Sequence, residues 1–450
     1  MKIKQVVVLP GQAQVASSIL PGLRQLGLQI CDRLSLEGDC SDYLLICDQG
    51  YEKNPSGSLF IRQALASGCA VLMNDADIAG ILQEIKECNG LSAQTRNRLE
   101  AYALFLCMQS DSERLAALQA EREGMPRYSA AVYELVQDLR YGENWHQKAA
   151  MYSKPDALGL QKAEKLNGRE MSYNNMVDAE TVLEMLIDLS EYDGIPTEKP
   201  LSVIVKHANP CGAAYGKDMA EAYRLSFATD PKSAYGGVIG FNRPVDTDTA
   251  RAIGNSFVEV LLAPGYEPEA LKLLTDKKPN RRILDIGDLL TRKSELYQGY
   301  YQKSIFGGMM LQDYDTADIK EWKVVTKRAP TESETQALRF AWKVSKYVKS
   351  NALVYTTKCQ TIGIGSGQVS RVDSARFGAE KAEEHGLSTK GTVAATDSFF
   401  PFRDGLDQTH KAGAVAVIHP GGSIRDAEVI DAANEHDMAM VFTGMRHFRH

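Results

Sequence analysis

The sequence places two proton carriers, Lys206 and His207, directly after an apolar, β-branched run at Ser202–Val205. Such a run predicts a buried strand, and the ends of strands are where α/β folds display functional side chains. An ammonium beside an imidazole is suited to general acid–base catalysis, although a surface lysine beside a hydrogen-bonded histidine is the interpretation that this segment alone favours. After the pair we expect Asn209-Pro210 to turn the chain and Gly212 to loosen it.

Five further clusters hold side chains that could bind or react. They are Arg140–Asn144, Thr229–Gly237, Gly363–Arg371, Asp397–Asp404 and Met445–His450. The first gathers a cation, a phenol, a carboxylate and an amide around one glycine, and the second is a turn-rich loop before an expected strand at 238–241. The closely spaced glycines of the third would let backbone amides approach an anion or a flat ring, and a plain structural turn explains them equally well.

The aromatic and basic clusters each allow two interpretations. Three phenylalanines within Phe399–Phe402 favour core packing, and a slot for a planar heterocycle is the functional alternative. The basic C-terminal residues follow an apolar, strand-like segment, so we expect this end to be docked. Docked arginines suit bidentate phosphate binding, and a solvated basic tail is the alternative.

The spacing of these residues argues against three familiar kinds of site. A dinucleotide fingerprint would need a third glycine where Gln368 or Ser370 stands. A zinc deaminase would need a second cysteine where Ala214 stands, and no His-x-Glu precedes it, so we expect no zinc and assign no residue as a metal ligand. The glycines around Ser366 are too close together for a serine hydrolase.

The elements that must position these clusters fall into two parts. Up to about residue 88, expected strands (6–9, 43–46, 70–73) alternate with expected helices (17–26, 78–87), which predicts a small doubly wound α/β unit. Ser92 caps a long helix, and Gly124 and Pro126 mark a domain boundary, giving domains 1–125 and 126–450. In the second part we expect a helix from the capping box at Thr331 toward Val348, then strands at 414–418 and 438–442 joined by a helix at 427–436.

The composition limits the classes of function. A net charge of −7 argues against broad binding to nucleic acid or to a membrane surface, and no apolar run approaches the roughly 20 residues that span a bilayer. The opening residues do not look like a secretory signal. The eight cysteines are scattered singly, which is typical of reduced thiols in the cytoplasm, and packing is the default role of Cys211.

In this order, the clusters closely resemble the bifunctional purine-biosynthesis family that joins AICAR transformylase to IMP cyclohydrolase. The resemblance covers residues from about 135 to the end and includes further motifs at 172–175, 349–351 and 420–426. It implies an α/β fold: an N-terminal methylglyoxal-synthase-like doubly wound unit, then a transformylase region of two cytidine-deaminase-like lobes without zinc. It also implies formyl transfer from 10-formyltetrahydrofolate to the 5-amino group of AICAR ribotide, in a homodimer that shares its active sites. A monovalent cation such as potassium is a further candidate ligand.

The resemblance also implies residue roles. His207 would accept the proton of the arylamine, Lys206 would help the folate nitrogen leave, and Asn351 would position the formyl group. The positions matching AICAR contacts are Arg140, Tyr141, Gly236, Glu259 (Asp in some relatives) and Arg446, the last a phosphate-binding position. The positions matching the folate side are Arg371, Phe399, Phe402 and Asp404.

The N-terminal part departs from the family pattern. The first loop reads Leu9–Ala13, the Lys-Thr-Leu-His-Pro segment is missing, Cys47–Gly50 replaces Asn-Leu-Tyr-Pro-Phe, and Ser67 stands at a lysine position. We therefore expect a shortened, degenerate domain without cyclohydrolase activity. A bifunctional enzyme that uses substituted residues is one alternative, and a non-catalytic regulator that binds AICAR is another.

Overall fold

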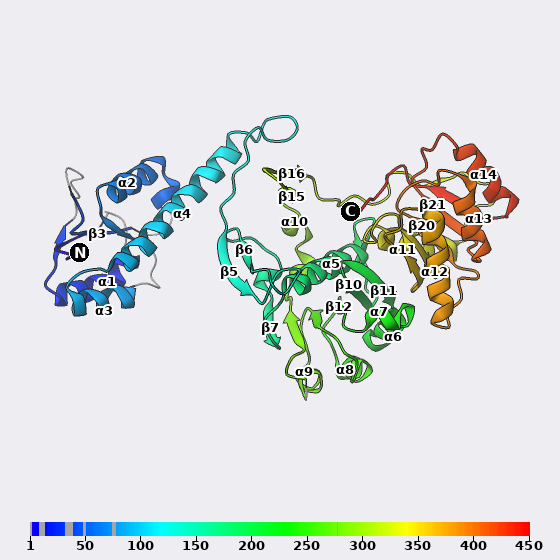
Figure 1. Ribbon diagram of the computed structural model, residues 1–450, viewed down its shortest axis with the longest axis horizontal. Helices are drawn as coiled ribbons and strands as arrows, with labels where there is room; N and C mark the ends of the chain where they lie inside the picture. The colour runs from blue at the N-terminus through cyan, green and yellow to red at the C-terminus, as the bar shows by residue number, and fades with distance from the viewer. Residues whose placement is uncertain (1, 9–13, 32–38, 48–50, 74–77, 277) are drawn as a thin grey trace. The chain divides into compact units, whose positions relative to one another are not determined.

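The computed structural model describes residues 2–8, 14–31, 39–47, 51–73, 78–276 and 278–450. The chain divides into two compact units, Met1–Glu134 and Leu135–His450 (Figure 1). The boundary expected from the sequence, between residues 125 and 126, falls a little earlier in the chain than this division. No helix in the described ranges is long and apolar enough to cross a membrane.

The first unit is built on a parallel four-stranded sheet with the order β2-β1-β3-β4. Its elements are β1 (Gln5–Val8), α1 (Gln14–Gln25), β2 (Gln29–Cys31), β3 (Tyr43–Ile46), η1 (Tyr51–Lys53), α2 (Pro55–Ala66), β4 (Ala70–Leu72), α3 (Ile78–Cys88) and α4 (Ala93–Ala117). The three predicted strands are present, although Leu9, expected to end the first, lies outside the described residues. The short strand β2 and helix α2 were not predicted.

Alternation along these strands sends successive side chains to opposite faces of the sheet, and helices bury both faces. Val6 packs with residues of α1 and α3, whereas the next residue, Val7, packs with residues of α2 and α4. This is the doubly wound arrangement that the sequence predicted. Ser92 caps α4 as expected, because its hydroxyl accepts a hydrogen bond from the Thr95 amide at 3.2 Å.

The second unit contains two lobes that repeat one topology. The first lobe comprises β7 (Glu164–Asn167), α5 (Tyr173–Leu189), β10 (Leu201–Lys206), β11 (Asn209–Tyr215), α6 (Met219–Thr229), β12 (Val238–Phe241), α8 (Thr247–Ile253), β13 (Val260–Ala263), α9 (Pro268–Thr275) and β14 (Arg282–Asp285). The second comprises β17 (Lys323–Val324), α11 (Glu332–Ser345), β18 (Leu353–Thr356), β19 (Thr361–Gly365), α12 (Arg371–Glu384), β20 (Val393–Thr396), α13 (Arg403–Lys411), β21 (Ala416–His419), α14 (Asp426–Glu435) and β22 (Ala439–Phe442).

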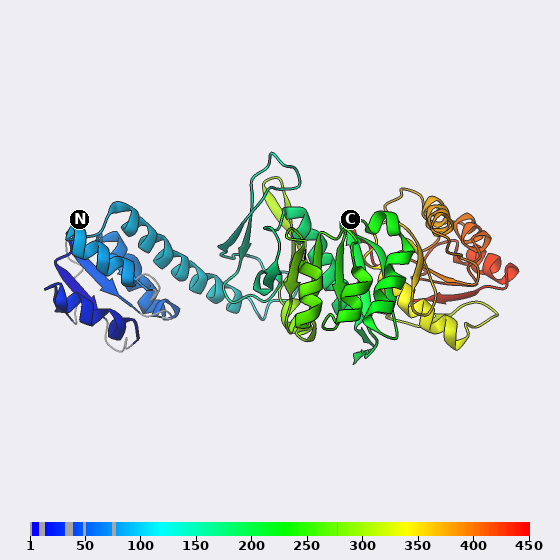
Figure 2. The same cartoon turned by 90° about the horizontal axis from the view of Figure 1, so that it is seen from below.

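Each lobe is a three-layered sandwich with the same strand order. The sheets run β11-β10-β12-β13-β14-β7 and β19-β18-β20-β21-β22-β17, with an antiparallel hairpin at one edge and parallel strands in the middle. Apolar residues of α6, α8 and α9 cover one face of the first sheet, and α5 covers the other. In the second lobe, α12, α13 and α14 cover one face of the sheet and α11 covers the other. Figure 2 shows the helices of the first lobe side by side along their sheet.

The two lobes meet along the edge hairpins of their sheets. The Tyr215 amide of β11 donates to the Cys359 carbonyl at 2.8 Å, and Ala214 bridges Gln360. Buried Thr229 donates from its hydroxyl to the Thr361 carbonyl at 2.6 Å. Each edge strand is therefore covered by the other lobe rather than by solvent.

Glycines in these edge strands let helices pack unusually close. A Cβ on Gly212 of β11 would lie 2.0 Å from the Ser226 carbonyl oxygen of α6. On Gly363 and Gly365 of β19 it would lie 2.1 and 1.9 Å from carbonyl oxygens of α12. Gly363 and Gly365 thus belong to a strand and serve helix–strand packing, whereas Gly367 of the same cluster lies beyond the strand in a bend, with φ of 66°.

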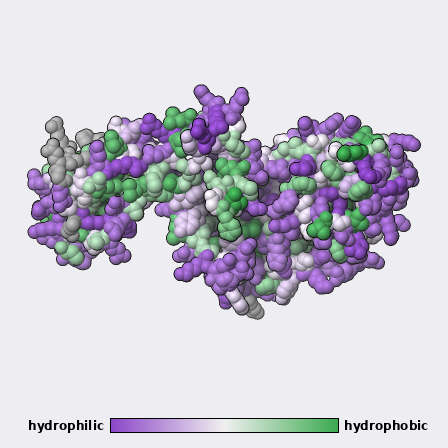
Figure 3. Space-filling model, turned by 45° about the horizontal axis from the view of Figure 1, so that its top comes forward, coloured by the Kyte–Doolittle hydropathy of each residue, from purple (hydrophilic) through white to green (hydrophobic). Residues whose placement is uncertain are grey.

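Two β-ribbons complete the second unit, and both carry exposed apolar side chains. They are β5 (Glu134–Leu139) with β6 (Ala149–Ser153), and β15 (Tyr301–Ile305) with β16 (Gly308–Gln312). Their exposed large apolar residues are Leu135, Val136, Tyr152, Tyr301, Ile305, Phe306, Met309 and Met310. Elsewhere the face shown in Figure 3 is mostly hydrophilic, with apolar patches between polar areas. The remaining short elements are η3 (Leu160–Lys162), β8 (Glu191–Tyr192), β9 (Ile195–Pro196), α7 (Pro231–Ala234), η4 (Leu289–Thr291) and α10 (Lys293–Leu296).

The elements predicted in the second lobe are present with shifted ends. The capping box is formed by Thr331 and Glu334, and the helix it opens stops at Ser345 rather than Val348. The expected strands at 414–418 and 438–442 are β21 and β22, and the helix expected at 427–436 is α14.

Candidate active site

The Lys-His pair lies at a tight hairpin turn. Lys206 ends β10 and pairs with Asn209, the first residue of β11, so His207 and Ala208 alone form the turn. Both have positive φ, 56° and 55°, as the central residues of a type I′ turn do. The expectation that Asn209-Pro210 turns the chain is therefore wrong: the reversal is completed before them, and Pro210 lies near the start of an edge strand, where proline is tolerated.

A buried carboxylate holds this turn. Asp178 of α5 is only 8% exposed, and its two oxygens accept hydrogen bonds from the His207 amide at 3.2 Å and the Ala208 amide at 2.6 Å. Burial raises the pKa of Asp178, while the two amides and the nearby charges of His207 and Lys206 act in the opposite direction. A residue other than glycine is destabilised by about 1–2 kcal/mol when its backbone adopts the left-handed conformation. The two hydrogen bonds to Asp178 offset this cost at His207 and Ala208.

Lys206 reaches toward the turn-rich loop that the sequence singled out. Its ammonium donates to the Tyr235 carbonyl at 2.7 Å. The next residue, Gly236, has φ of 74°, which suits glycine, and its amide donates to the Phe257 carbonyl at 2.9 Å. The rings of Tyr235 and Phe257 lie 5.0 Å apart. Gly236 is thus one residue from a direct contact of Lys206, and the His207 side chain is exposed.

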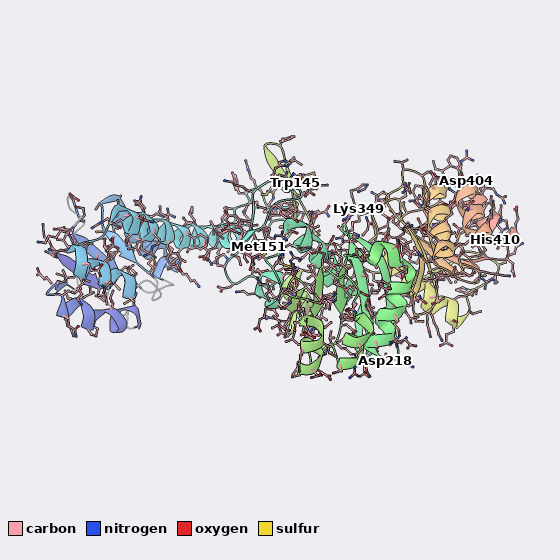
Figure 4. The ribbon with its side chains drawn as sticks, turned by 60° about the horizontal axis from the view of Figure 1, so that its bottom comes forward. Trp145, Met151, Asp218, Lys349, Asp404 and His410 are labelled. Carbon is pink, nitrogen blue, oxygen red and sulfur yellow. The ribbon has the colours of Figure 1, made fainter. Side chains whose placement is uncertain are left out.

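The second lobe contributes a segment, Lys349–Asn351, that is tied to the end of this hairpin. The Lys349 amide donates to the Asn209 side-chain oxygen at 2.9 Å, so the segment that carries Asn351 is tied to the end of the hairpin turn. Figure 4 shows Lys349 where the two lobes meet. The Asn351 carboxamide donates to the Gln368 carbonyl at 2.9 Å and accepts from Arg371 at 2.8 Å, which fixes its orientation.

The Arg371 side chain is nearly buried and makes several hydrogen bonds within the protein. Its side chain is 9% exposed, and its guanidinium donates to Thr396, to the Phe399 carbonyl, to Asn351 and to Asp397. Asp397 is fully buried; it pairs with Arg371 at 3.0 Å and also accepts from the Ser350 hydroxyl. The structure therefore gives Arg371 a role in holding Asn351, beyond the folate contact that the resemblance implies.

The aromatic cluster divides into a core residue and outer residues. Phe400 is buried and packs against the position of Gly405, as the core interpretation expects. Phe399 is half-buried and joins the site through its carbonyl oxygen. Phe402 is about half exposed, with the Arg425 guanidinium 4.9 Å from its ring. Asp404 lies in the first turn of α13, in the second lobe (Figure 4).

A basic cavity of about 320 Å³ lies in the first lobe. Its charged lining residues are Arg140, Arg169, Glu259, Lys278, Arg281 and Arg282. Buried Arg282 donates to Glu259 at 2.6 Å, and Phe257 lines the same cavity. The excess of cations suits an anion such as a phosphate. The Phe257 carbonyl accepts a hydrogen bond from the Gly236 amide, and Gly236 follows Tyr235, whose carbonyl accepts from Lys206. The loop that contacts Lys206 is therefore also bonded to a residue that lines the cavity.

Tyr141 lies beside Arg140. The Arg140 guanidinium is 5.3 Å from the Tyr141 ring, and the Tyr141 carbonyl accepts from the Tyr173 amide at 3.3 Å. Of the AICAR-contact positions implied by the resemblance, Arg140 and Glu259 line the basic cavity, and Tyr141 contacts Arg140.

A second cavity, of about 350 Å³, opens beside the hairpin turn. Residues of both lobes line it, among them Lys206, His207, Lys232, Ser366 and Lys381. Cys211 lines it too, but burial raises the pKa of its thiol to about 12, so the thiol stays protonated near neutral pH. This agrees with packing as the role of Cys211.

The C-terminus is docked, as its sequence suggested. His447 is buried with its ring 2.7 Å from Asp315, and Arg449 pairs with Glu184 at 2.8 Å. Arg446, the implied phosphate-binding residue, is instead exposed, with its guanidinium 4.5 Å from the Phe448 ring. Arg446 is not among the described residues that line the basic cavity.

Asp178 and Arg282 help to organise the site and were not predicted from the sequence, whereas Asn209 and Asp397 were named only as parts of local motifs. All four act through partners that are distant in the sequence. One signal was available for Asp178: it is an acidic residue among the apolar residues of a helix whose positions are mostly buried. Such a residue needs a buried partner.

Comparisons with known proteins point in one direction. A family model described as the AICARFT/IMPCHase bienzyme matches residues 66–381. The bifunctional purine biosynthesis protein PurH of Acidithiobacillus ferrooxidans is 44% identical over 404 residues, which covers 88% of this chain and 75% of that protein. PurH of Persephonella marina is 44% identical over 386 residues, covering 84% and 73%.

Proposed function

Because this chain belongs to the AICARFT/IMPCHase bienzyme family of purine biosynthesis, we propose that it transfers a formyl group from 10-formyltetrahydrofolate to the 5-amino group of AICAR ribotide. The products are FAICAR and tetrahydrofolate. The observation that carries this proposal is the meeting of the Lys206–His207 turn of one lobe with the Asn351 segment of the other, joined by the Asn209–Lys349 hydrogen bond. A site that only bound ribotides would not need the two proton carriers.

In the proposed reaction, these groups take the roles that the resemblance implies. The AICAR amine attacks the formyl carbon, a C–N bond forms, and His207 accepts the proton that the amine loses. Lys206 stabilises the tetrahedral oxyanion and supplies a proton to N10 of the folate as the C–N10 bond breaks. The carboxamide of Asn351, fixed by Arg371 and by the Gln368 carbonyl, orients the formyl group.

We propose that the ribotide binds at the basic cavity. The ribotide phosphate would lie among its cations with Arg140, and Glu259 would be held by Arg282 to accept hydrogen bonds from the ribotide. The cavity beside the turn would take the formyl folate, next to residues of both lobes. The folate positions Phe399, Phe402 and Asp404 follow α12 in the second lobe.

We further propose that the protein acts as a homodimer. Exposed Arg446, Phe402 and Asp404 would then complete the active site of the partner subunit rather than that of their own chain. The exposed apolar ribbons β5–β6 and β15–β16 support a subunit contact, since large apolar side chains in a patch mark interaction surfaces. Light scattering after size exclusion would test this, and Phe306→Glu, at the fully exposed tip of β15–β16, should weaken the dimer.

Purified protein given AICAR and 10-formyltetrahydrofolate should release tetrahydrofolate, which is followed spectroscopically. If the protein binds AICAR but releases no tetrahydrofolate, the result would favour the alternative of a non-catalytic regulator that binds AICAR. A potassium requirement is tested in the same assay by exchanging potassium for sodium.

We also propose that cyclohydrolase activity is lost. The loop at 9–13 and most of Cys47–Gly50 lie outside the described residues, but Ser67 is placed at the C-terminal cap of α2, where a hydroxyl cannot replace a lysine cation. The relatives are named bifunctional, and the family model begins at residue 66, inside the first unit. Closure of FAICAR to IMP is therefore the competing function.

A further inference from the structure

Asp178 is a buried carboxylate whose partners differ from those of its neighbour on the same helix. Asp188, 6% exposed, pairs with the ammonium groups of Lys343 at 3.0 Å and Lys346 at 3.3 Å. Asp178 is 8% exposed, and the hydrogen bonds it accepts come from the His207 and Ala208 amides. Buried carboxylates are normally paired with cations. A buried carboxylate that instead accepts hydrogen bonds from two turn amides points to a role in that turn.

The turn needs such a support because of its sequence. Two-residue type I′ turns favour Asn-Gly, since both central residues take positive φ. Here they are His207 and Ala208, whose Cβ atoms oppose that conformation. Asp178 accepts from both amides at once, one with each oxygen, so it fixes the peptide planes on both sides of the His207 Cα and thus the direction in which the His207 side chain leaves the backbone.

We propose that Asp178 is a positioning residue for formyl transfer, holding the strained His207–Ala208 turn so that His207 faces the reacting amine. The inference rests on the proposed function. Asp178 does not line either of the two cavities described above, so its effect passes through the turn and not through the substrate. Displacement of a general base by about 1 Å can cost on the order of 100-fold in rate.

The test is Asp178→Asn, which keeps the side-chain volume but replaces one accepting oxygen with a donor facing a turn amide. We expect kcat to fall at least 10-fold, while the AICAR dissociation constant stays within twofold because the basic cavity is untouched. The matched control is Asp218→Ala, which removes the N-cap of α6 at the opposite end of the lobe from Lys349 (Figure 4). It should lower the melting temperature without changing kcat at 25 °C.

Rescue separates positioning from stability. Glycine takes positive φ without strain, so Asp178→Asn combined with Ala208→Gly should show a kcat several-fold higher than Asp178→Asn alone. If Asp178→Asn does not fold alone, the double variant compared with Ala208→Gly carries the same test. Wild-type kcat in Asp178→Asn, or a loss that Ala208→Gly does not relieve, would overturn the inference.

A readout without turnover keeps this inference apart from the proposed function. Hydrogen exchange of the peptide spanning 201–215 should accelerate at the turn in Asp178→Asn and not in Asp218→Ala. An inactive wild-type protein whose turn is loosened by Asp178→Asn would refute formyl transfer and with it the catalytic use of the turn. An active wild type with unchanged exchange and unchanged kcat in Asp178→Asn would refute the role of Asp178 alone.

Discussion

The side-chain oxygen of Asn209 accepts a hydrogen bond from the backbone amide of Lys349 at 2.9 Å, and this bond joins the two halves of the candidate active site. On one side of it are Lys206 and His207, at the end of the first-lobe hairpin. On the other is Asn351, two residues beyond Lys349. The distance between the proton carriers and the carboxamide therefore depends on a contact between lobes.

Replacing Asn209 should uncouple the two halves. In Asn209→Ala the Lys349 amide loses its acceptor, at a cost of about 1 kcal/mol in the free energy of unfolding. We expect a larger effect on catalysis, about 10-fold in kcat, because Asn351 would lose its register with His207. Asn209→Asp, which keeps an accepting oxygen, should retain most of the activity. Steady-state kinetics and urea unfolding would measure both effects, and equal kcat in all three proteins would contradict the prediction.

Removing the proposed base should separate chemistry from binding. His207→Ala should abolish measurable tetrahydrofolate release while AICAR still binds, because the cations of the basic cavity are unchanged. Calorimetry and the release assay give the two quantities. Unchanged turnover would refute the role of His207.

The ion pair between Arg282 and Glu259 should matter for substrate affinity. Arg282→Met leaves Glu259 without its 2.6 Å partner and removes a cation from the cavity, so the AICAR dissociation constant should rise about 10-fold with little change in kcat. Arg251→Met is the control, because Arg251 pairs with Asp248 on the exposed surface, where such pairs contribute little. The hypothesis fails if both variants bind AICAR equally well.

The N-terminal unit should not close FAICAR to IMP. Ser67 cannot supply the positive charge that a lysine would give to a developing anion. Incubation of purified protein with FAICAR, followed by chromatography for IMP, tests this, and a bifunctional PurH relative is the positive control. Appreciable IMP formation would establish the bifunctional alternative.

Buried His419 should make stability depend on acidic pH. Burial, with a contribution from nearby Arg371, lowers the pKa of His419 from 6.5 to about 3. Between pH 6.5 and about 3, His419 is protonated in the unfolded chain but not in the folded chain. The contribution of His419 to the free energy of unfolding is therefore complete above pH 6.5 and is lost as the pH falls toward 3. The slope is at most about 1.4 kcal/mol per pH unit. His419→Asn, which can still accept from the Gly421 amide, should flatten the dependence seen in urea unfolding; equal slopes would contradict it.

Features that depend on local sequence were predictable. The apolar run before Lys206 forms β10, Ser92 and Thr331 cap their helices, and the pattern of the first unit gives a doubly wound sheet. These signals lie within a few residues of the elements they define. The same locality explains why the ends of elements were shifted by a few residues, since tertiary contacts decide where a helix such as α11 stops.

Features that depend on distant partners were not predictable. An Asn-Pro pair is a strong local turn signal, but the reversal at His207–Ala208 is stabilised by Asp178, which is 29 and 30 positions away. Gly363 and Gly365 could not be assigned to strand packing without knowing that α12 lies against them. The burial of Arg371 against Asp397 was likewise hidden, because a cation in a motif looks the same whether it faces solvent or a carboxylate.

The contact between β11 and the second-lobe hairpin, made at Cys359 and Gln360, has a consequence for the independence of the lobes. Each lobe has its own sheet and layers, so each looks like a separable domain, yet the outer strand of each hairpin directs its free backbone groups at the other lobe. A lobe expressed alone would present that strand to water, open to pairing with a second copy. The duplicated halves are therefore obligate neighbours, and an enzyme split between them would be expected to aggregate unless both pieces were made together.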